Sequence, residues 1–357
     1  MKNTVVWVLG NGQLGAMLCD AGKPLGIDVR PIDIMASSST QLSLNDDDFV
    51  TAEREEWPET PLSLQLSQHH NFINKAVFNT LANRQYQKKL LDDLTIPTAP
   101  WLSLDRGIST SALYQKLGSR VLLKRSTGGY DGKGQHWLNQ SDQTIIPNDW
   151  FEQSIAEQGI DFDEEVSLVG ARTRDGKCHF YPLTLNYHQN GILMASIAPF
   201  TRLDGLTQQA ENMLTDIMEH LNYVGVMAME CFRVKNKLLV NELAPRVHNS
   251  GHWTQSGSHI NQFEMHLRAL CDLPIAKLNF EPQIVMINLI GVEKNQGWLT
   301  IPNAKLFWYD KEVREGRKVG HLNIAVDDNI IEALNSLSSM LPINYQQTLV
   351  WVANELG

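Results

Sequence analysis

The chain has 357 residues, which exceeds one ordinary compact domain and predicts two or three. Hydrophobic residues make up 43% of the sequence and charged residues only 20%, so the composition is typical of a globular, soluble protein. The formal net charge of −10 argues against nucleic acid or an anionic membrane as the main partner, while leaving small anionic ligands open.

The cysteines and the apolar segments favour a cytoplasmic location. The four cysteines are scattered and form no CxxC pair, which predicts neither a zinc site nor a disulfide framework. No apolar run reaches the roughly 20 residues needed to span a bilayer. The start of the chain predicts a strand and a turn rather than a signal peptide, because Asn11 and Gln13 interrupt it.

The N-terminal part alternates between strand and helix patterns, which indicates a parallel α/β sheet. Strands are expected at 4–9, 27–32 and 48–51, and helices at 13–21 and 84–94. A domain boundary is predicted at 95–100, because Pro97 and Pro100 stop the second helix.

The remainder predicts mixed helix and sheet. A helix at 110–117 and a strand at 120–125 lead into a glycine-rich loop at 128–134, and strands dominate from 155 to 198. A helix at 206–221 precedes two strands, 224–234 and 238–243. The tail from 278 combines short elements with one cationic loop, 311–321.

Two glutamates stand in the otherwise apolar strands 224–234 and 238–243. If Asn236 is the centre of a three-residue hairpin loop, Glu230 and Glu242 are equally far from it and face each other, with Cβ atoms ~5 Å apart. A register slip of one residue would place Asn241 opposite Glu230 instead.

Facing carboxylates repel each other, so they need a counter-ion or a proton. Mg²⁺ suits such a pair, because it takes carboxylate oxygens and substrate phosphates together. The alternative is two glutamates of an edge strand that face water. The apolar flanks of Glu230 favour the metal.

The glycine-rich loop Gly128–Gly134 follows a strand that carries Lys124. Its four glycines let backbone N–H groups approach an anion closely, and Lys133 adds positive charge. The spacing is not that of a P-loop, and the HRD and DFG motifs of kinases are absent. An exposed hairpin tip is an equally good interpretation.

A second glycine motif, GNGQLG at 10–15, stands between a predicted strand and a predicted helix. With Asp33 about twenty residues on, it matches the dinucleotide fingerprint. It also fits any phosphate or small anion at a helix N-terminus, and the motif does not choose between these ligands.

The segment 245–252 combines a guanidinium, two imidazoles, an amide and a hydroxyl directly after Glu242. Arg246 is suited to a planar anion such as bicarbonate or a carboxylate. A polar loop with hydrogen-bonded histidines is the alternative. Proximity to the expected metal site favours function.

Taken in order, these motifs resemble a known family. GNGQLG is followed by a lysine before GGYDGKG, by EQGI with Glu165 eight residues on, by MEC and NELAPRVHNSGHWT, and finally by KEVREGRKVGH. This series is similar over nearly the whole chain to the 5-(carboxyamino)imidazole ribonucleotide synthase family of the ATP-grasp superfamily, the ATPase subunit of bacterial purine biosynthesis. NELAPRVHNSGHWT is its most specific part.

The resemblance implies an ATP-grasp fold of mixed α/β and α+β class in three parts. It predicts a Rossmann-like (preATP-grasp) domain at 1–97, an ATP-grasp domain with two lobes around ATP at 98–277, and a small C-terminal domain at 278–357. It also implies a homodimer.

The resemblance further implies a set of ATP-binding residues. The phosphates would be held by Arg84, Lys124, Gly129, Tyr130, Asp131, Gly132, Lys133, Gly134 and Gln135. The adenine hinge would be Glu157, Gln158, Gly159 and Ile160, with Glu165 on the ribose hydroxyls and His188 beside it. Asn241 would assist Glu230 and Glu242 in binding Mg²⁺ and the nucleotide.

The implied reaction joins ATP, bicarbonate and 5-aminoimidazole ribonucleotide through carboxyphosphate. Asp131, Arg246 and Lys124 would be catalytic. The ribonucleotide and bicarbonate would contact Gly12, Gln13, Leu14, Glu53, Tyr130, Asp131, Arg246, His248, Asn249 and Ser250, with Lys311, Arg317 and Lys318 around the phosphate. For the ribose, Glu55 is nearly as good a ligand as Glu53. Arg54 stands where the family resemblance implies an apolar residue, and this departure concerns only the Glu53 assignment.

Three rival functions remain. A nicotinamide-dependent oxidoreductase would use GNGQLG and Asp33, but it leaves the paired glutamates and Arg246 unexplained. A different ATP-grasp ligase, acting on glycinamide ribonucleotide or biotin, disagrees with HNSGHWT and with the tail. A non-catalytic nucleotide-binding regulator would not need the metal and lysine positions.

Overall fold

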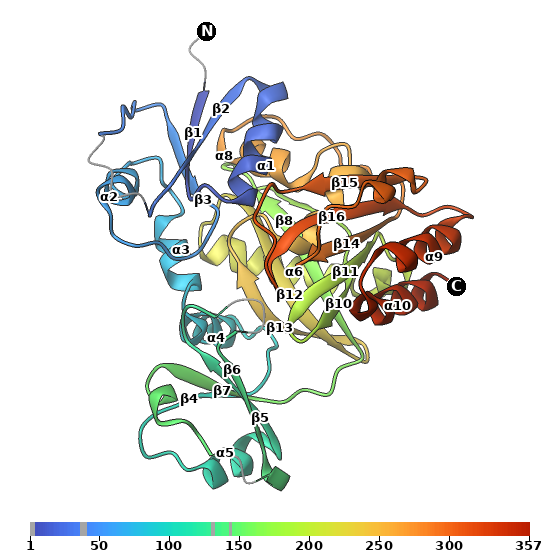
Figure 1. Ribbon diagram of the computed structural model, residues 1–357. Helices are drawn as coiled ribbons and strands as arrows, with labels where there is room; N and C mark the ends of the chain where they lie inside the picture. The colour runs from blue at the N-terminus through green and yellow to red at the C-terminus, as the bar shows by residue number, and fades with distance from the viewer. Residues whose placement is uncertain (1–3, 36–40, 130–132, 143–144) are drawn as a thin grey trace.

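The computed structural model describes residues 4–35, 41–129, 133–142 and 145–357. Its strands form three sheets of three, four and nine strands. Figure 1 shows the smallest sheet in the N-terminal part and the four-stranded sheet in a lobe apart from the largest sheet. Within the described ranges, no helix is long and apolar enough to cross a membrane.

The N-terminal sheet has the order β2-β1-β3 and is parallel, as predicted. Its strands are β1 (Thr4–Leu9), β2 (Ile27–Ile32) and β3 (Phe49–Ala52). Helix α1 (Gln13–Gly22) follows β1, and α2 (Pro61–Ser67) and α3 (Lys75–Leu81) follow β3. The apolar run of β1 is buried because it is the central strand.

Helix α4 (Arg84–Asp93) leads to a separate antiparallel sheet of order β4-β7-β5-β6. Its strands are β4 (Trp101–Ser103), β5 (Arg120–Arg125), β6 (Gln135–Asn139) and β7 (Ser154–Gln158), and α5 (Thr110–Leu117) packs against it. This lobe has its own small core around Leu113, Val121 and Leu123. In Figure 1 it projects away from the rest of the molecule.

The large sheet runs in the order β13-β12-β8-β10-β11-β14-β16-β15, with β9 paired to β8. Its first strands are β8 (Glu164–Arg172), β9 (Cys178–Phe180), β10 (Thr184–Gln189), β11 (Ile192–Ala198), β12 (Gly225–Val234) and β13 (Lys237–Ala244). The tail adds β14 (Ile284–Ile290), β15 (Ala304–Trp308) and β16 (Lys318–Ala325). Because β14 pairs with β11, one sheet continues across the boundary predicted at 278.

Five helices accompany the large sheet: α6 (Thr207–His220), α7 (Thr254–Gly257), α8 (Gln262–Leu270), α9 (Ile330–Met340) and α10 (Gln346–Leu356). Helix α8 packs on β12 and on α1, so it joins the N-terminal domain to the large sheet. Side chains from α6, α9 and α10 share one continuous core with the strands.

The β12–β13 hairpin differs from the prediction in one respect. Its turn has two residues, Lys235 and Asn236, because Val234 pairs directly with Lys237. The three-residue loop was therefore wrong, and the register starts one residue away from the predicted one. A bulge at Asn241 shifts it back, so that Glu230 does pair with Glu242.

Candidate active site

The candidate site lies on one face of the large sheet, where β8, β10, β12 and β13 run side by side. Directly paired residues point to the same face. Glu230 pairs with Glu242, and the next residue of β12 on that face, Phe232, pairs with Glu165 of β8. The sheet thus brings together three glutamates that lie far apart in sequence.

Burial raises the pKa of Glu230, and the charges of Glu242 and Glu165 raise it further. His188 and Lys318 offset part of this effect. The side chains of Glu230 and Glu242 are 20% and 44% exposed, so both carboxylates remain partly accessible to solvent. Two opposed carboxylates of this kind fit a divalent cation, which would neutralise both.

The described residues contain no group of three or more His, Cys, Asp or Glu side chains placed to hold a metal. A cation held by Glu230 and Glu242 would need water or phosphate oxygens at its further positions. This arrangement is typical of Mg²⁺, which keeps several non-protein ligands.

Glu165 is paired with His188 across β8 and β10. Oε2 of Glu165 lies 2.8 Å from Nδ1 of His188. Burial alone would lower the pKa of His188, but the hydrogen bond and charge of Glu165 outweigh it and raise the pKa. The predicted ribose ligand is thus held in place by the histidine predicted beside it.

Lys124 lies at the end of β5 in the detached lobe, and its ammonium reaches the large sheet. Nζ donates to Oδ1 of Asn241 at 2.8 Å and lies 2.7 Å from Oε2 of Glu157. The bulge of β13 aims Asn241 at this lysine. One acceptor from each lobe thus fixes the ammonium.

Glu157, the first residue of the predicted adenine hinge, has a different environment from the one expected. Its carboxylate is 4% exposed and lies between Lys124 and Lys88, each 2.7 Å away. Burial alone would raise its pKa, but the two ammonium groups lower the pKa to about 2. Lys88 was not predicted as a site residue, because its only signal in the sequence is its position one helical turn after Arg84.

The rest of the hinge is held by backbone contacts. Gly159 donates its N–H to the carbonyl of Arg120 at 2.9 Å, and a Cβ there would come within 2.9 Å of Trp137. Gln158 donates its N–H to Pro100. Ile160 follows β7 and is half-buried.

Arg84 holds the glycine-rich loop against the large sheet. Its Nη1 donates to the carbonyl of Arg125 and its Nη2 to that of Gly129, and Nη2 lies 3.5 Å from Oε1 of Glu242. Gly134 adopts a positive φ of 68°, and Gln135 starts β6 beside Lys133. Tyr130, Asp131 and Gly132 lie outside the described residues.

Arg246 is 21% exposed in its side chain and forms an ion pair with Glu55, 2.8 Å from Nη2 to Oε1. Burial would lower its pKa, but the carboxylates of Glu55, Glu242 and Glu230 raise it. Of the two glutamates considered for the ribose, Glu55 is therefore engaged by the guanidinium.

His248 lies 3.7 Å from Glu230, measured from Nε2 to Oε1. Its Nδ1 accepts the N–H of Ser250, which places the proton of the neutral ring on Nε2, toward the glutamate. Burial and the charges of Arg246 and Lys318 lower the pKa of His248 well below its ordinary value. Among the described residues, neither amide atom of the buried Asn249 has a partner.

Glu53 has a role that the sequence did not predict. Its Oε1 accepts the N–H of Gly12 at 2.6 Å and its Oε2 that of Gly15 at 2.7 Å. A Cβ at Gly10 or Gly12 would come within 2.4 or 2.8 Å of this carboxylate. The carboxylate of Glu53 thus occupies the N-terminus of α1. A bound dinucleotide would place its phosphate at this position.

The cationic loop meets the N-terminal domain at the same place. Lys311 donates to Oε1 of Gln13, next to the half-buried Leu14. Lys318 is the first residue of β16, and its charge affects the pKa values of Glu230, His188 and His248. Arg317 instead donates to the carbonyl of Glu312 within the loop.

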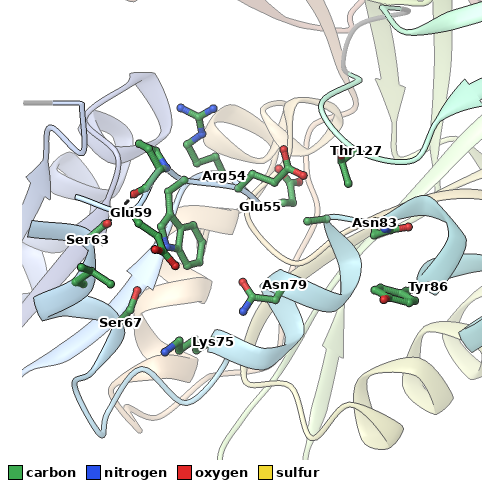
Figure 2. A pocket seen from close by; sticks show the side chains of 15 residues that line it. Arg54, Glu55, Glu59, Ser63, Ser67, Lys75, Asn79, Asn83, Tyr86 and Thr127 are labelled. Atoms are coloured by element: carbon green, nitrogen blue, oxygen red, sulfur yellow. Dashed lines mark hydrogen bonds between the residues drawn. The ribbon is translucent and has the colours of Figure 1, made fainter. Parts of the chain in front are cut away.

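Glu55 also lines a pocket of about 640 Å³ next to this site. Figure 2 shows Arg54, Glu55 and Glu59 on one side, Asn79 from α3 and Asn83 on another, and Thr127 facing them. The pocket therefore lies between the N-terminal domain and the loop before Gly128.

Two family models match the chain. The ATP-grasp domain covers residues 89–263, and the phosphoribosylaminoimidazole carboxylase C-terminal domain covers 284–335. The N5-carboxyaminoimidazole ribonucleotide synthase of Escherichia coli (strain K12) is 50% identical over 99% of this chain and 99% of its own. The chain belongs to the N5-carboxyaminoimidazole ribonucleotide synthase family.

Solved structures of this family share the fold. The synthetase from Thermus thermophilus has a TM-score of 0.78 at 32% identity, covering 94% of this chain and 98% of that one. The Aspergillus clavatus synthase has a TM-score of 0.80 at 27% identity, covering 99% and 100%. The latter was crystallised with ADP and 5-aminoimidazole ribonucleotide.

Proposed function

We propose that this protein catalyses the ATP-dependent carboxylation of 5-aminoimidazole ribonucleotide to N5-carboxyaminoimidazole ribonucleotide. Membership of the family is the basis of the proposal. The main structural support is that residues from the detached lobe and residues from the C-terminal part meet at the same face of the large sheet. Lys124 reaches Asn241, the residue before Glu242, from the detached lobe. In the C-terminal part, Lys311 contacts Gln13 of the GNGQLG loop, and the charge of Lys318 acts on Glu230.

In the proposed nucleotide half, ATP lies between the detached lobe and the large sheet. Lys124, Arg84 and the loop from Gly129 to Gln135 would hold the phosphates. Glu157 to Ile160 would border the adenine and Glu165 the ribose. The ion pair of Glu165 with His188 and the backbone contacts of the hinge support these roles, because they fix the groups before ATP arrives.

Glu230 and Glu242 would hold Mg²⁺ together with phosphate oxygens of ATP. The ion, when bound, supplies positive charge against which the phosphoryl group is transferred. Asn241 assists from the protein side, since its side chain connects β13 to Lys124. The raised pKa of Glu230, caused first by burial and then by the charges of Glu242 and Glu165, supports this proposal, because a bound cation would stabilise the buried carboxylate and offset the repulsion.

Bicarbonate would bind at Arg246, His248, Asn249 and Ser250. One bicarbonate oxygen attacks the γ-phosphorus and ADP leaves, giving carboxyphosphate. The exocyclic amine of the ribonucleotide then attacks the carboxyl carbon, phosphate leaves with the bridging oxygen, and the amine loses a proton. Arg246 neutralises the carboxylate, and Lys124 the transferred group. Asp131 is the proposed proton acceptor.

The ribonucleotide would lie between the GNGQLG loop and the cationic loop. Lys311 and Lys318 are the better phosphate ligands, since Arg317 is turned toward Glu312. Gly12, Gln13 and Leu14 would contact the ribose phosphate side, and Tyr130 the aminoimidazole. Glu53 holds this loop by its backbone, so Glu53 acts on the substrate through the loop.

Three further features are proposed from the sequence and the family resemblance. The chain forms a homodimer, it acts in the cytoplasm, and its domains are 1–97, 98–277 and 278–357. For the last boundary, the large sheet joins strands from both sides of residue 278, so the two domains share a sheet.

The proposal is tested by ADP release with a panel of acceptors. We expect ADP release to require Mg²⁺ and bicarbonate and to be stimulated strongly by 5-aminoimidazole ribonucleotide. If glycinamide ribonucleotide or biotin stimulates ADP release instead, the assignment of 5-aminoimidazole ribonucleotide as the substrate is wrong.

A further inference from the structure

Lys88 is a buried cation that none of the family motifs in this sequence includes. It lies on α4, one turn after Arg84, with 3% of its side chain exposed. Its Nζ lies 2.7 Å from Oε1 of Glu157 and donates to Oγ1 of Thr98 at 2.6 Å. A lysine is rarely buried to this extent without a specific partner.

Lys88 and Lys124 share one carboxylate. Each ammonium lies 2.7 Å from a different oxygen of Glu157, and all three side chains are less than 8% exposed. Burial lowers the pKa of Lys88, while the charge of Glu157 raises it. With both lysines protonated, the cluster carries one net positive charge. Without Lys88, Glu157 and Lys124 would form a neutral pair, and Lys124 would attract phosphate more weakly in this buried setting.

Thr98 connects Lys88 to the other lobe. Its Oγ1 donates to the carbonyl of Val240 at 2.6 Å, and Thr98 forms an isolated bridge with Val240. Val240 directly precedes Asn241, the second acceptor of Lys124. Both acceptors of Lys124 are thus tied to Lys88, one through Glu157 and one through the backbone of β13.

We propose that Lys88 is a positioning residue of the nucleotide site. It neutralises one oxygen of Glu157, and so leaves Lys124 with a net positive charge directed at the phosphates of ATP. The inference rests on the proposed function, because it takes Lys124 as the phosphate ligand. Lys88 itself needs no contact with the nucleotide.

The test compares Lys88→Met, Lys88→Arg and the neighbouring Lys89→Met, which changes an exposed lysine. We expect Lys88→Met to weaken binding of ADP with Mg²⁺, measured by calorimetry, by roughly ten- to a hundredfold. KM for ATP should rise, while KM for 5-aminoimidazole ribonucleotide stays within about twofold. Lys88→Arg should retain most of the affinity, and Lys89→Met all of it.

If Lys88→Met fails to fold, Thr98→Val replaces it in the test. Thr98→Val should also weaken ADP binding, by a smaller factor than expected for Lys88→Met. A folded Lys88→Met with ADP affinity within about twofold of wild type would overturn the inference. So would an equal rise of both KM values, which indicates a general structural role. If the wild-type protein itself does not bind ADP, the proposed function fails instead.

Discussion

Glu230 on β12 lies directly opposite Glu242 on β13, and the pairing depends on a bulge at the residue before Glu242. The two-residue turn alone would bring Asn241 opposite Glu230. The extra residue restores the pairing of the two glutamates. It also places Asn241 where its side-chain oxygen accepts a hydrogen bond from Lys124. The same bulge therefore positions the proposed metal ligands, Glu230 and Glu242, and the acceptor of the proposed phosphate ligand, Lys124.

Glu230→Gln and Glu242→Gln should each abolish turnover in a folded protein. Each change removes one of two facing carboxylates, and so relieves repulsion in the metal-free fold. Without Mg²⁺, both variants should therefore melt no lower than the wild type. A large fall in the melting temperature would assign these glutamates a structural role.

Lys311→Ala should raise KM for 5-aminoimidazole ribonucleotide by about ten- to a hundredfold, the cost of one charge-assisted contact to phosphate. KM for ATP should change by less than about twofold, since ATP contacts lie elsewhere. Lys318→Ala should act in the same direction. Arg314→Ala is the matched control, because Arg314 is exposed and pairs with Glu312. If all three variants have the same KM for 5-aminoimidazole ribonucleotide, the loop is a charged surface without a role in substrate binding.

Glu53→Gln should lower the free energy of unfolding by roughly 1–3 kcal/mol, because an amide can accept only one of the two backbone N–H groups. Urea denaturation measures the effect. Glu56→Gln, at an exposed position two residues after Arg54, is the control and should change little. If the two variants are equally stable, the carboxylate does not hold the loop.

Acid should destabilise the fold in part through His266. Its Nδ1 accepts the N–H of Val226 and its Nε2 contacts Oγ1 of Thr51, so the buried ring is neutral. Burial lowers its pKa from 6.5 to about 4. Between these values the unfolded chain binds a proton that the fold does not, so stability falls as pH decreases through this window.

Urea denaturation from pH 7 to pH 4 measures this loss, to which one histidine contributes up to about 1.4 kcal/mol per pH unit. His266→Gln removes the titrating ring, and the pH dependence should become shallower. An unchanged slope in the variant would show that other groups account for the acid sensitivity.

Local patterns predicted most of the fold. The strands 4–9 and 27–32, the helix 110–117 and the strand 120–125 are found at the predicted residues, because apolar periodicity and turn residues act locally. The opposition of Glu230 and Glu242 was also predicted, although from a turn that proved wrong. A hairpin's end register is set by turn and bulges together, and a bulge leaves no clear pattern in one sequence.

Two other missed features are long-range contacts. Glu53 reaches back to Gly12 and Gly15, and Lys88 meets Glu157 from another element. Such pairs form only when the chain brings distant segments together, and a single sequence gives no spacing from which to infer them. The glycines of GNGQLG fit a phosphate and a carboxylate equally well, so the motif could not reveal which anion is present.

Oxygen transfer tests the central claim most directly. With ¹⁸O-labelled bicarbonate, 5-aminoimidazole ribonucleotide and Mg²⁺–ATP, the account predicts one labelled oxygen in each phosphate released, because the bridging oxygen of carboxyphosphate comes from bicarbonate. Formation of the carboxylated ribonucleotide should match ADP release. Phosphate without label, or ADP release that does not depend on the ribonucleotide, would contradict the account.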